Sequence, residues 1–283
     1  MREYSDKIAF FLFIPFVFLL SCNHDLPTKP SGNIIYVGKS HSGPQQGTRE
    51  NPYLTIASGV SAAKEGASII VLPGDYIEKD IKLKKGQKVF SEEPNAAIVT
   101  NAADYYDLFV LYNCDQCEIR NFKIIWNIGG KGFKYPISCE SSDSINISNN
   151  QFEGEGFYVS LCNGSIKGNK INGCSGIYAL PITGKGDLLV ENNDIYISSI
   201  CYYIGFGMSF GGDTNSARMI VRNNTVSGIS GGIDISSSSN VILENNTVIN
   251  NQLWGIKIEG QWTYPWSMID LGGGAGVCLS QLH

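Results

Sequence analysis

The sequence predicts an all-β fold, a single-stranded right-handed parallel β-helix with a short N-terminal capping helix, from three observations. Glycine is abundant, with 32 of 283 residues, and charged residues make up only 17%, which favours strands and tight turns over helices. A short pattern built around two asparagine-like residues recurs from residue 114 onward. After most copies comes a short run in which apolar and polar residues alternate, as in strands with one buried face.

The repeat is an apolar residue, any residue, two asparagine-like residues, any residue and a second apolar residue. Its six copies are residues 119–124, 147–152, 166–171, 190–195, 221–226 and 243–248. Helical repeats would need apolar spacings of three and four, and propeller blades would need about twice this period. A coil of about 22 residues with three short strands, each pairing in parallel with its equivalent one coil along, fits the pattern. The crossover rule makes the coil right-handed.

The segment 68–83 shows how one strand follows another in such a coil. Two strands joined by Pro73-Gly74 could form a hairpin, but this is not the Asn-Gly turn that hairpins favour. In a coil the chain only bends at this point and continues onto the next face. Alternation along the second strand predicts that Asp75, Glu78 and Asp80 are outward polar residues.

The asparagine pairs are expected to form a ladder at one corner of the stacked coils. Equivalent side chains would lie about 4.8 Å apart, so each amide could donate to one neighbour and accept from the other. Asparagine also tolerates the left-handed backbone of a turn. The predicted ladder residues are Asn121, Asn149, Asn150, Asn169, Asn192, Asn193, Asn223, Asn224, Asn245 and Asn246.

The N-terminus predicts export and a lipid anchor. Residues 1–22 contain a 13-residue apolar run from Ile8 to Leu20, which suits a signal peptide and is short for a membrane-spanning helix. The ending Leu19-Leu20-Ser21-Cys22 resembles the bacterial lipobox, which implies acylation of Cys22; a plain secretory signal is the alternative. Residues 23–33 have the polar, proline-containing composition of a tether. Asn23 favours the outer membrane or cell surface as the location.

Seven cysteines remain after Cys22, an odd number that cannot all pair within one chain. The register of the repeat places Cys117 at an inward position and Cys114 at the turn before it. A second C-x-x-C or a histidine pair is missing, which weakens zinc and thioredoxin-type interpretations. Small buried side chains are therefore the favoured role for this pair over a redox or metal role.

Residues 34–78 carry a family resemblance through Tyr36-Val37, Gly47-Thr48, Asn51-Pro52, a short helix near 54–64 and Pro73-Gly74-Asp75-Tyr76-Ile77-Glu78. This stretch resembles the opening of bacterial right-handed β-helix proteins of the pectate-lyase-like superfamily, in particular a family of unknown function. The resemblance implies a fold more than a chemistry.

The resemblance divides the chain into a cap with the first coils at 34–90 and further coils at 91–275. Residues 276–283 depart from the family pattern, which suggests a truncated end. We expect a monomer whose exposed last coil is prone to associate.

Composition and motifs limit the chemistry. A net charge of −5 argues against nucleic acid as a partner. The three histidines are His24 in the tether, His41 in the first loop and the terminal His283, so histidine-based catalysis and histidine-rich metal sites are not expected. Residues 231–241 are similar to a stretch of polygalacturonases, but the catalytic motifs of that family are missing. We predict no catalytic residue and no cofactor, with calcium only if the protein is a lyase.

A ligand-binding face is predicted from the outward residues of the alternating strands. These are Tyr158, Tyr178, Asp234 and Lys257, followed by an aromatic loop with Trp262, Tyr264 and Trp266. Aromatic rings beside polar groups often grip extended glycans; the same residues could equally be ordinary strand positions, an ion pair and a patch over the core end. The expected function is a non-catalytic, lipid-anchored binding or interaction protein of the cell envelope. The alternative is a polysaccharide lyase or glycoside hydrolase.

Overall fold

The computed structural model describes residues 34–39, 42–102, 106–126, 134–180, 186–198, 205–211, 218–228, 231–236 and 240–259. All of them belong to one compact unit, Gly32–His283. The predicted signal peptide with Cys22, the tether and the segment 276–283 lie outside the described residues. Within the described ranges, no helix has the length and apolar character needed to cross a membrane.

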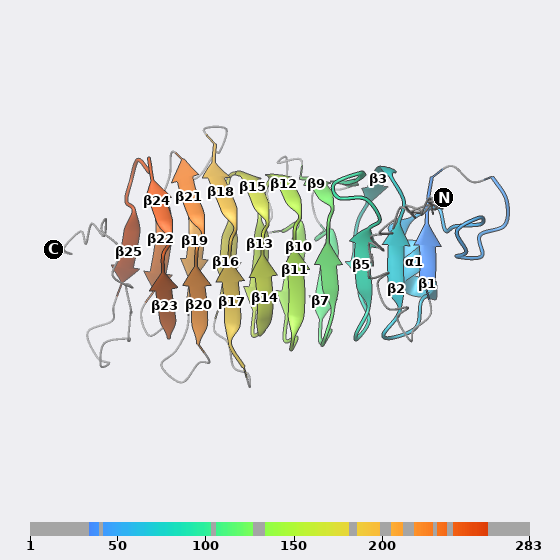
Figure 1. Ribbon diagram of the computed structural model, residues 1–283, viewed down its shortest axis with the longest axis horizontal. Coiled ribbons are helices and arrows are strands. Elements are labelled where there is room, and N and C mark those ends of the chain that lie inside the picture. The colour runs from blue at the N-terminus through green and yellow to red at the C-terminus, as the bar shows by residue number, and fades with distance from the viewer. Residues whose placement is uncertain are drawn as a thin grey trace, which may run out of the picture. The chain divides into compact units, whose positions relative to one another are not determined.

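Three parallel sheets, which we name A, B and C, build the fold (Figure 1). Sheet A is formed by β1 (Ile34–Val37), β2 (Ser68–Val71), β5 (Lys88–Ser91), β8 (Glu118–Arg120), β11 (Ile145–Ser148), β14 (Gly164–Lys167), β17 (Leu188–Glu191), β20 (Met219–Arg222) and β23 (Val241–Glu244). Sheet B is formed by β3 (Gly74–Glu78), β6 (Ala97–Asn101), β9 (Lys123–Ile125), β12 (Gln151–Gly154), β15 (Lys170–Gly173), β18 (Asp194–Ile197), β21 (Thr225–Gly228) and β24 (Thr247–Ile249). Sheet C is formed by β4 (Ile81–Lys82), β7 (Phe109–Tyr112), β10 (Ile137–Glu140), β13 (Phe157–Ser160), β16 (Ile177–Ala179), β19 (Phe206–Phe210), β22 (Gly231–Ser236) and β25 (Ile256–Glu259).

This architecture confirms the predicted right-handed parallel β-helix. From β2 onward each strand pairs with its equivalent one coil along, so that neighbours within a sheet are three strands apart in the chain (Figure 1). In the first coil β1 pairs directly with β2. The two apolar ends of the repeat lie in different sheets: Ile147 pairs with Ile166 in sheet A, whereas Phe152 pairs with Ile171 in sheet B. Both columns are buried, and each such side chain removed from water stabilises the fold by about 1.5–3 kcal/mol.

Pro73-Gly74 acts as predicted, because the chain leaves sheet A after β2 and enters sheet B at β3. The predicted capping helix is also present as α1 (Ile56–Ala62). Gly59 allows α1 to pack closely on the first strand, since a Cβ at this position would lie 2.5 Å from the Val37 side chain. The helix thus covers the end of the core at the first coil, beside β1 and β2 (Figure 1).

Side chains from the first coils hold both ends of α1. At its start, the backbone N–H groups of Ile56 and Ala57 donate to the Glu78 carboxylate at 2.8 and 3.4 Å. At its end, Gln87 Nε2 donates to the Val60 carbonyl at 3.0 Å and Lys84 Nζ donates to the Ala63 carbonyl at 2.8 Å. The prediction that Glu78 faces outward is therefore wrong. Its carboxylate satisfies helix N–H groups that have no partner within the helix, and it is only 5% exposed.

The asparagine corner, defined as the two-residue connections between sheets A and B from β8 onward, divides its work between two columns. Residues in the first column adopt positive φ between 52° and 67°, namely Asn121, Asn149, Gly168, Asn192, Asn223 and Asn245. Residues in the second column form the amide ladder, namely Asn150, Asn169, Asn193, Asn224 and Asn246. Along this ladder each Nδ2 donates to the next Oδ1 at 3.1, 3.0, 2.9 and 2.9 Å.

The asparagine ladder is thus confirmed, but only the second residue of each pair forms it. The first residue supplies the left-handed backbone that asparagine and glycine tolerate. The sequence alone predicts that each asparagine of a pair both joins the amide ladder and tolerates the left-handed backbone.

The described cysteines are buried, as the register predicts for Cys114 and Cys117. These two are joined by a disulfide, and Cys174 is disulfide-bonded as well. Cys139 and Cys162 are free thiols. The predicted burial of Cys114 and Cys117 is therefore confirmed, and the structure adds that a disulfide joins them.

Candidate functional site

The connections that enter and leave sheet C differ from the asparagine corner in length. Sheets A and B are joined by only two residues in every coil from β8 onward, such as 192–193. By contrast, 126–136 and 198–205 lead into sheet C, and 180–187 and 211–218 lead out of it. From β8 onward the coils thus vary at the two edges of sheet C and not between sheets A and B; before β8, the five residues 92–96 join β5 to β6. Loops of variable length carry binding and catalytic residues more often than the regular elements that they join.

One row of outward residues runs along sheet C. Register pairs Tyr158 with Tyr178, Tyr178 with Ser209, Ser209 with Asp234, and Asp234 with Lys257. The structure therefore places four of the predicted ligand-binding residues in one line, in the predicted order. Ser209 was missed, although Gly207-Met208-Ser209-Phe210 repeats the glycine and alternating residues that mark the other strands of this sheet.

Three tyrosine rings form a stack on this face. Tyr135 lies 5.3 Å from Tyr158 with an interplanar angle of 18°, and Tyr158 lies 5.7 Å from Tyr178 at 33°. Tyr135 precedes β10 in a long connection outside the repeat, so no sequence pattern indicated it. The Tyr158 ring thus lies between a ring from the coil before it and a ring from the coil after it. We expect a ligand to meet mainly ring edges and hydroxyl groups at Tyr158.

Carboxylates position and surround the tyrosine stack. Asp107 Oδ1 accepts the backbone N–H of Tyr135 at 2.8 Å, which fixes the first ring. Glu155 is buried, accepts a hydrogen bond from Ser175 Oγ, and acts with Tyr178 to disfavour ionisation of Tyr135. Burial is the main cause that raises the pKa of Tyr135 to about 12, and the electrostatic interactions with Tyr178 and Glu155 add to it.

Tyr178 also remains a neutral phenol near pH 7. Burial raises its pKa, and the charges of Tyr158 and Asp234 raise it further. A neutral tyrosine hydroxyl both donates and accepts hydrogen bonds. The face therefore offers neutral hydroxyl groups beside a carboxylate, a combination suited to polyhydroxylated ligands.

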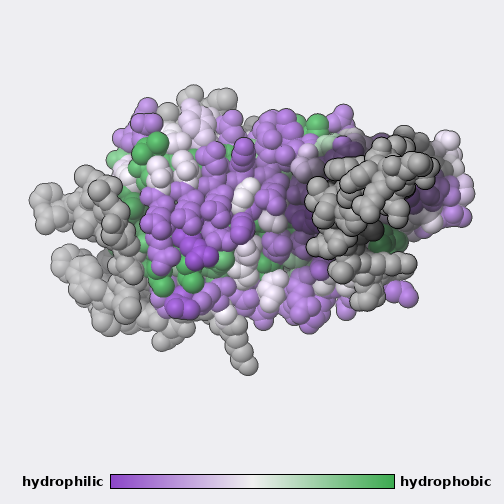
Figure 2. All heavy atoms as spheres, in the orientation of Figure 1, coloured by the Kyte–Doolittle hydropathy of each residue, from purple (hydrophilic) through white to green (hydrophobic). Residues whose placement is uncertain are grey.

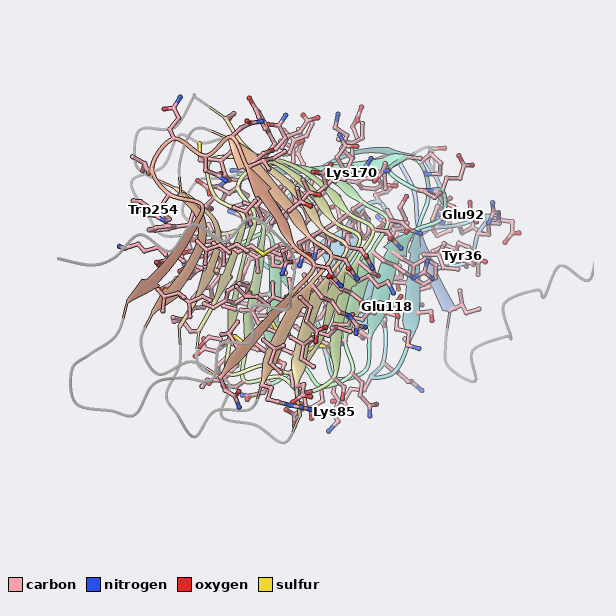
Figure 3. All side chains as sticks on the ribbon, turned by 60° about the vertical axis from the view of Figure 1, so that its left-hand side comes forward. Tyr36, Lys85, Glu92, Glu118, Lys170 and Trp254 are labelled. Atoms are coloured by element: carbon pink, nitrogen blue, oxygen red, sulfur yellow. A yellow bond between two sulfur atoms is a disulfide. The ribbon has the colours of Figure 1, made fainter. Side chains whose placement is uncertain are left out.

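The far end of the row, toward the last described coil, combines aromatic and cationic groups. Lys257 Nζ lies 4.9 Å from the centroid of the Trp254 ring, and Trp254 lies 5.9 Å from Phe206. Figure 3 shows Trp254 at the opposite end of the coil stack from Tyr36. The predicted aromatic loop residues Trp262, Tyr264 and Trp266 lie outside the described residues. The described part of the face is therefore a tyrosine stack followed by Ser209, Asp234 and Lys257.

The described side chains limit what this face can do chemically. All three histidines lie outside the described ranges. Within those ranges, no three His, Cys, Asp or Glu side chains gather as metal ligands would. Asp234, 8% exposed, is the acidic group of the outward row, and Glu155 lies beside the stack. From Tyr158 to Lys257 the row supplies hydrogen-bonding groups and one charge of each sign, which suits a binding surface.

Sheet A carries a different outer surface. A hollow of ≈ 480 Å³ lies there, lined in part by Lys88, Glu118 and Asn146, which share one row of the register. Figure 2 shows that the facing surface of the coils is mostly hydrophilic, with scattered hydrophobic side chains. Farther along, Glu191 bridges Lys167 and Arg222 at 2.9 Å each. Sheet A thus carries ion-paired charges here, whereas sheet C carries the tyrosine stack, and we take sheet C as the stronger candidate for a binding face.

These features define a class of protein, a right-handed parallel β-helix with one polar and aromatic outer sheet. The chain belongs to the family described as "Right handed beta helix region", whose model matches residues 107–265, more than half of the sequence. No curated protein sequence matches the chain.

Two solved structures share the fold. Pectin methylesterase PemA from Erwinia chrysanthemi is 13% identical with a TM-score of 0.54, over 80% of this chain and 80% of that one. The catalytic domain of a GH87 α-1,3-glucanase in complex with nigerose is 14% identical with a TM-score of 0.52, over 73% of this chain but only 40% of that one. At these identities the similarity is one of fold.

Proposed function

We propose that this chain is an exported, lipid-anchored β-helix protein of the bacterial cell envelope that binds an extended glycan along the outer face of sheet C without cleaving it. The observation that carries the proposal is the register that aligns Tyr158, Tyr178, Ser209, Asp234 and Lys257 in one row. Rows of this kind follow the solenoid axis and suit a ligand that is itself extended. Two proteins that share the fold act on pectin or an α-1,3-glucan by name, which supports a glycan as the ligand class.

The binding mode follows from the stacked rings. Because the Tyr158 ring lies between two neighbouring rings, hydroxyl groups of the stack and the Asp234 carboxylate supply most of the directed contacts. A hydrogen bond to a charged group contributes about 1.5–3 kcal/mol, so Asp234 should dominate specificity. Lys257 and Trp254 form the end of the row, where an acidic or a ring-stacked sugar would be accommodated.

Anchoring by Cys22 supports the envelope location. The lipobox-like Leu19-Leu20-Ser21-Cys22 places an acylated cysteine directly before the tether of residues 23–33. Such a chain would hold the coils next to a membrane surface, where envelope or extracellular polysaccharides are available. Radiolabelled palmitate should enter the wild-type chain and not Cys22→Ala; equal labelling of both would contradict lipidation at this residue.

The second candidate is a polysaccharide lyase or glycoside hydrolase, or another enzyme of polysaccharides. It is favoured by the two buried carboxylates on and beside the face, Asp234 and Glu155, and by the enzymes among the proteins that share the fold. Burial of this kind is common for acid and base catalysts. A lyase of this class would be expected to require calcium.

One experiment separates the two candidates. The purified protein is incubated with acidic and neutral polysaccharides, with and without calcium, while retention and newly formed chain ends are both recorded. Retention of one polysaccharide without new ends, reduced about tenfold or more in Asp234→Ala, is the expected result. New unsaturated or reducing ends that disappear in Asp234→Asn would establish catalysis. Absence of retention and of cleavage across the panel would contradict both candidates.

A further inference from the structure

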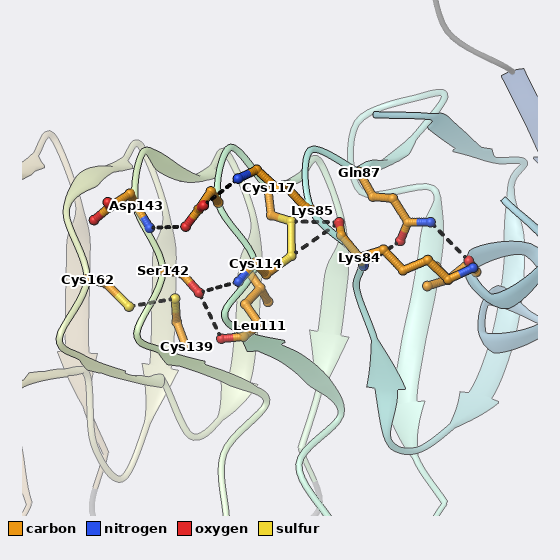
Figure 4. Close-up of a disulfide and its surroundings, with 12 residues drawn as sticks. Lys84, Lys85, Gln87, Leu111, Cys114, Cys117, Cys139, Ser142, Asp143 and Cys162 are labelled. Carbon is orange, nitrogen blue, oxygen red and sulfur yellow. Dashed lines mark hydrogen bonds and ion pairs between the residues drawn. A yellow bond between two sulfur atoms is a disulfide. The ribbon is translucent and has the colours of Figure 1, made fainter. Parts of the chain in front are cut away.

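Two free thiols face each other in the core under sheet C. Cys139 is an inward residue of β10, and Cys162 lies in the turn after β13, the next strand of the same sheet (Figure 4). Their Sγ atoms are 3.0 Å apart, and both residues are fully buried. The pair therefore joins two consecutive coils at a single point.

The distance between the sulfur atoms favours a covalent bond over a shared metal. Two cysteine ligands of one tetrahedral zinc, with Zn–S bonds near 2.3 Å, lie about 3.8 Å apart. A disulfide needs about 2.05 Å, so Cys139 and Cys162 are within about 1 Å of bonding distance.

The surrounding chain is already oxidised. The Cys114–Cys117 disulfide lies in the neighbouring coil, where the backbone N–H of Cys114 donates to Ser142 Oγ at 2.8 Å (Figure 4). Cys174, farther along the chain, is disulfide-bonded as well. Disulfides persist in oxidising compartments, where an adjacent pair of thiols would not remain reduced.

We propose that Cys139 and Cys162 form a disulfide that links consecutive coils. The oxidant is the disulfide of a small-molecule or protein carrier. The thiolate of one cysteine attacks one carrier sulfur and releases a carrier thiolate; the thiolate of the other cysteine then attacks the first cysteine's sulfur in the mixed disulfide and releases the second carrier thiolate. Two protons and two electrons leave the cysteines, and the carrier disulfide becomes two thiols.

A hydrogen bond joins the two thiols in the folded chain, and either sulfur can be its donor. Because both residues are fully buried, the reaction takes place while the coils close during folding, and the finished bond is shielded from reductants. It fixes the coil carrying Tyr158 to the coil before it, and it does not depend on which ligand the sheet C face binds.

Peptide mapping tests the proposal directly. The full chain is refolded from guanidinium in the presence of oxidised glutathione, quenched with acid, unfolded and alkylated without reductant. Peptides carrying Cys139 and Cys162 should appear linked to each other and two hydrogen masses lighter than the pair of free peptides. Complete alkylation of both cysteines in a refolded sample, or linkage of either one to a different cysteine, would overturn the proposal.

A double variant supplies a second readout. Both proteins are unfolded, their disulfides are reduced, and the free energy of unfolding is compared with that of the oxidised protein. The wild type should lose more of this free energy than Cys139→Ala/Cys162→Ala, because the variant has one disulfide fewer to lose. Closing a loop of this size changes the unfolding equilibrium roughly a hundredfold, and refolding in urea measures the difference. An identical loss on reduction in the two proteins would contradict the disulfide, whatever the intrinsic stability of the variant.

Discussion

The asparagine corner and the edges of sheet C differ in how constant their connections are from coil to coil. At the asparagine corner the chain turns in two residues in every coil from β8 onward, with one left-handed residue in each coil and, from Asn150 to Asn224, one buried amide. At the edges of sheet C the connections range from two residues, such as 155–156, to the long segment 126–136. A constant geometry keeps the coils in register, and the variable connections are free to differ from coil to coil.

The contrast between the ladder and sheet C indicates which residues can take part in binding. A buried amide in a continuous ladder cannot change without leaving its neighbours unsatisfied. An outward, partly exposed residue such as Tyr178 or Lys257 can change without disturbing the core. The repeated residues of this chain are therefore structural, and the outward residues of sheet C that differ between coils are the candidates for recognition.

The largest effect on stability is expected at the middle of the ladder. Asn193 donates to Asn224 Oδ1 and the Ile166 carbonyl, and its Oδ1 accepts from Asn169. Asn193→Ala leaves these buried groups unsatisfied, at about 1–3 kcal/mol each, so the free energy of unfolding should fall by about 3 kcal/mol or more in urea titrations. The matched control is Asn192→Gly, which keeps the left-handed backbone and should change stability by less than about 1 kcal/mol. Equal losses of unfolding free energy in the two variants would contradict the assignment of the amide ladder to the second residue and the left-handed turn to the first.

The next effect concerns the entry to sheet C. A Cβ at Gly176 would lie 1.9 Å from the Gly207 carbonyl oxygen of the next coil. Gly176→Ala should therefore cost about 2–3 kcal/mol of unfolding free energy and disturb the neighbouring Tyr178. Gly66→Ala is the control, because only its φ of +72° is unfavourable and its Cβ would meet open space; about 1 kcal/mol is expected. A smaller loss of unfolding free energy in Gly176→Ala than in Gly66→Ala would contradict this prediction, because it would mean that the coils move apart at Gly176 at little cost.

A smaller effect is expected on the outer face of sheet A. Hydrogen bonds from Lys167 and Arg222 hold the pKa of Glu191 below its ordinary value. Stability from these contacts is present above the ordinary glutamate pKa and is lost as the pH falls through the lowered value. Arg222→Ala should cost at most about 1 kcal/mol at neutral pH, and less in high salt. A loss that is independent of salt would indicate a packing role for Arg222.

The smallest effect tests the helix cap by pH. Burial raises the pKa of Glu78, despite hydrogen bonds from Ile56 and Ala57. The folded protein therefore binds this proton more tightly than the unfolded chain, and the resulting stability is full below the ordinary pKa and is lost as the pH rises through the folded value. Urea midpoints measured from pH 4 to 8 should fall with rising pH relative to Glu78→Gln. The opposite slope would contradict the direction of the pKa shift.

Much of the fold could be predicted from the sequence because residues at equivalent positions of the repeat stack on one another in successive coils. The column through Ile147 and Ile166 follows from apolar residues at equal positions of the repeat, and the asparagine ladder follows from the pairs between them. Glu78 was placed wrongly, because alternation along one strand does not reveal a helix packed over it.

The candidate site was predicted less completely, for two physical reasons. Ser209 has a small side chain and does not stand out among strand residues. Tyr135 comes from a long connection, so its position beside Tyr158 depends on tertiary structure. The disulfide between Cys114 and Cys117 could not be chosen from an odd number of cysteines without their positions in space.

The most direct test of sheet C as the binding face compares two outward tyrosines on different sheets. Tyr178 ends the ring stack on sheet C, whereas Tyr196 lies on sheet B and is 50% exposed. Affinity for the polysaccharide retained by the wild type would be measured for Tyr178→Ala and Tyr196→Ala, after circular dichroism has confirmed their folding. A loss of about tenfold in Tyr178→Ala, with unchanged affinity in Tyr196→Ala, is the predicted result. Unchanged affinity in Tyr178→Ala, or an equal loss in both variants, would contradict binding along sheet C.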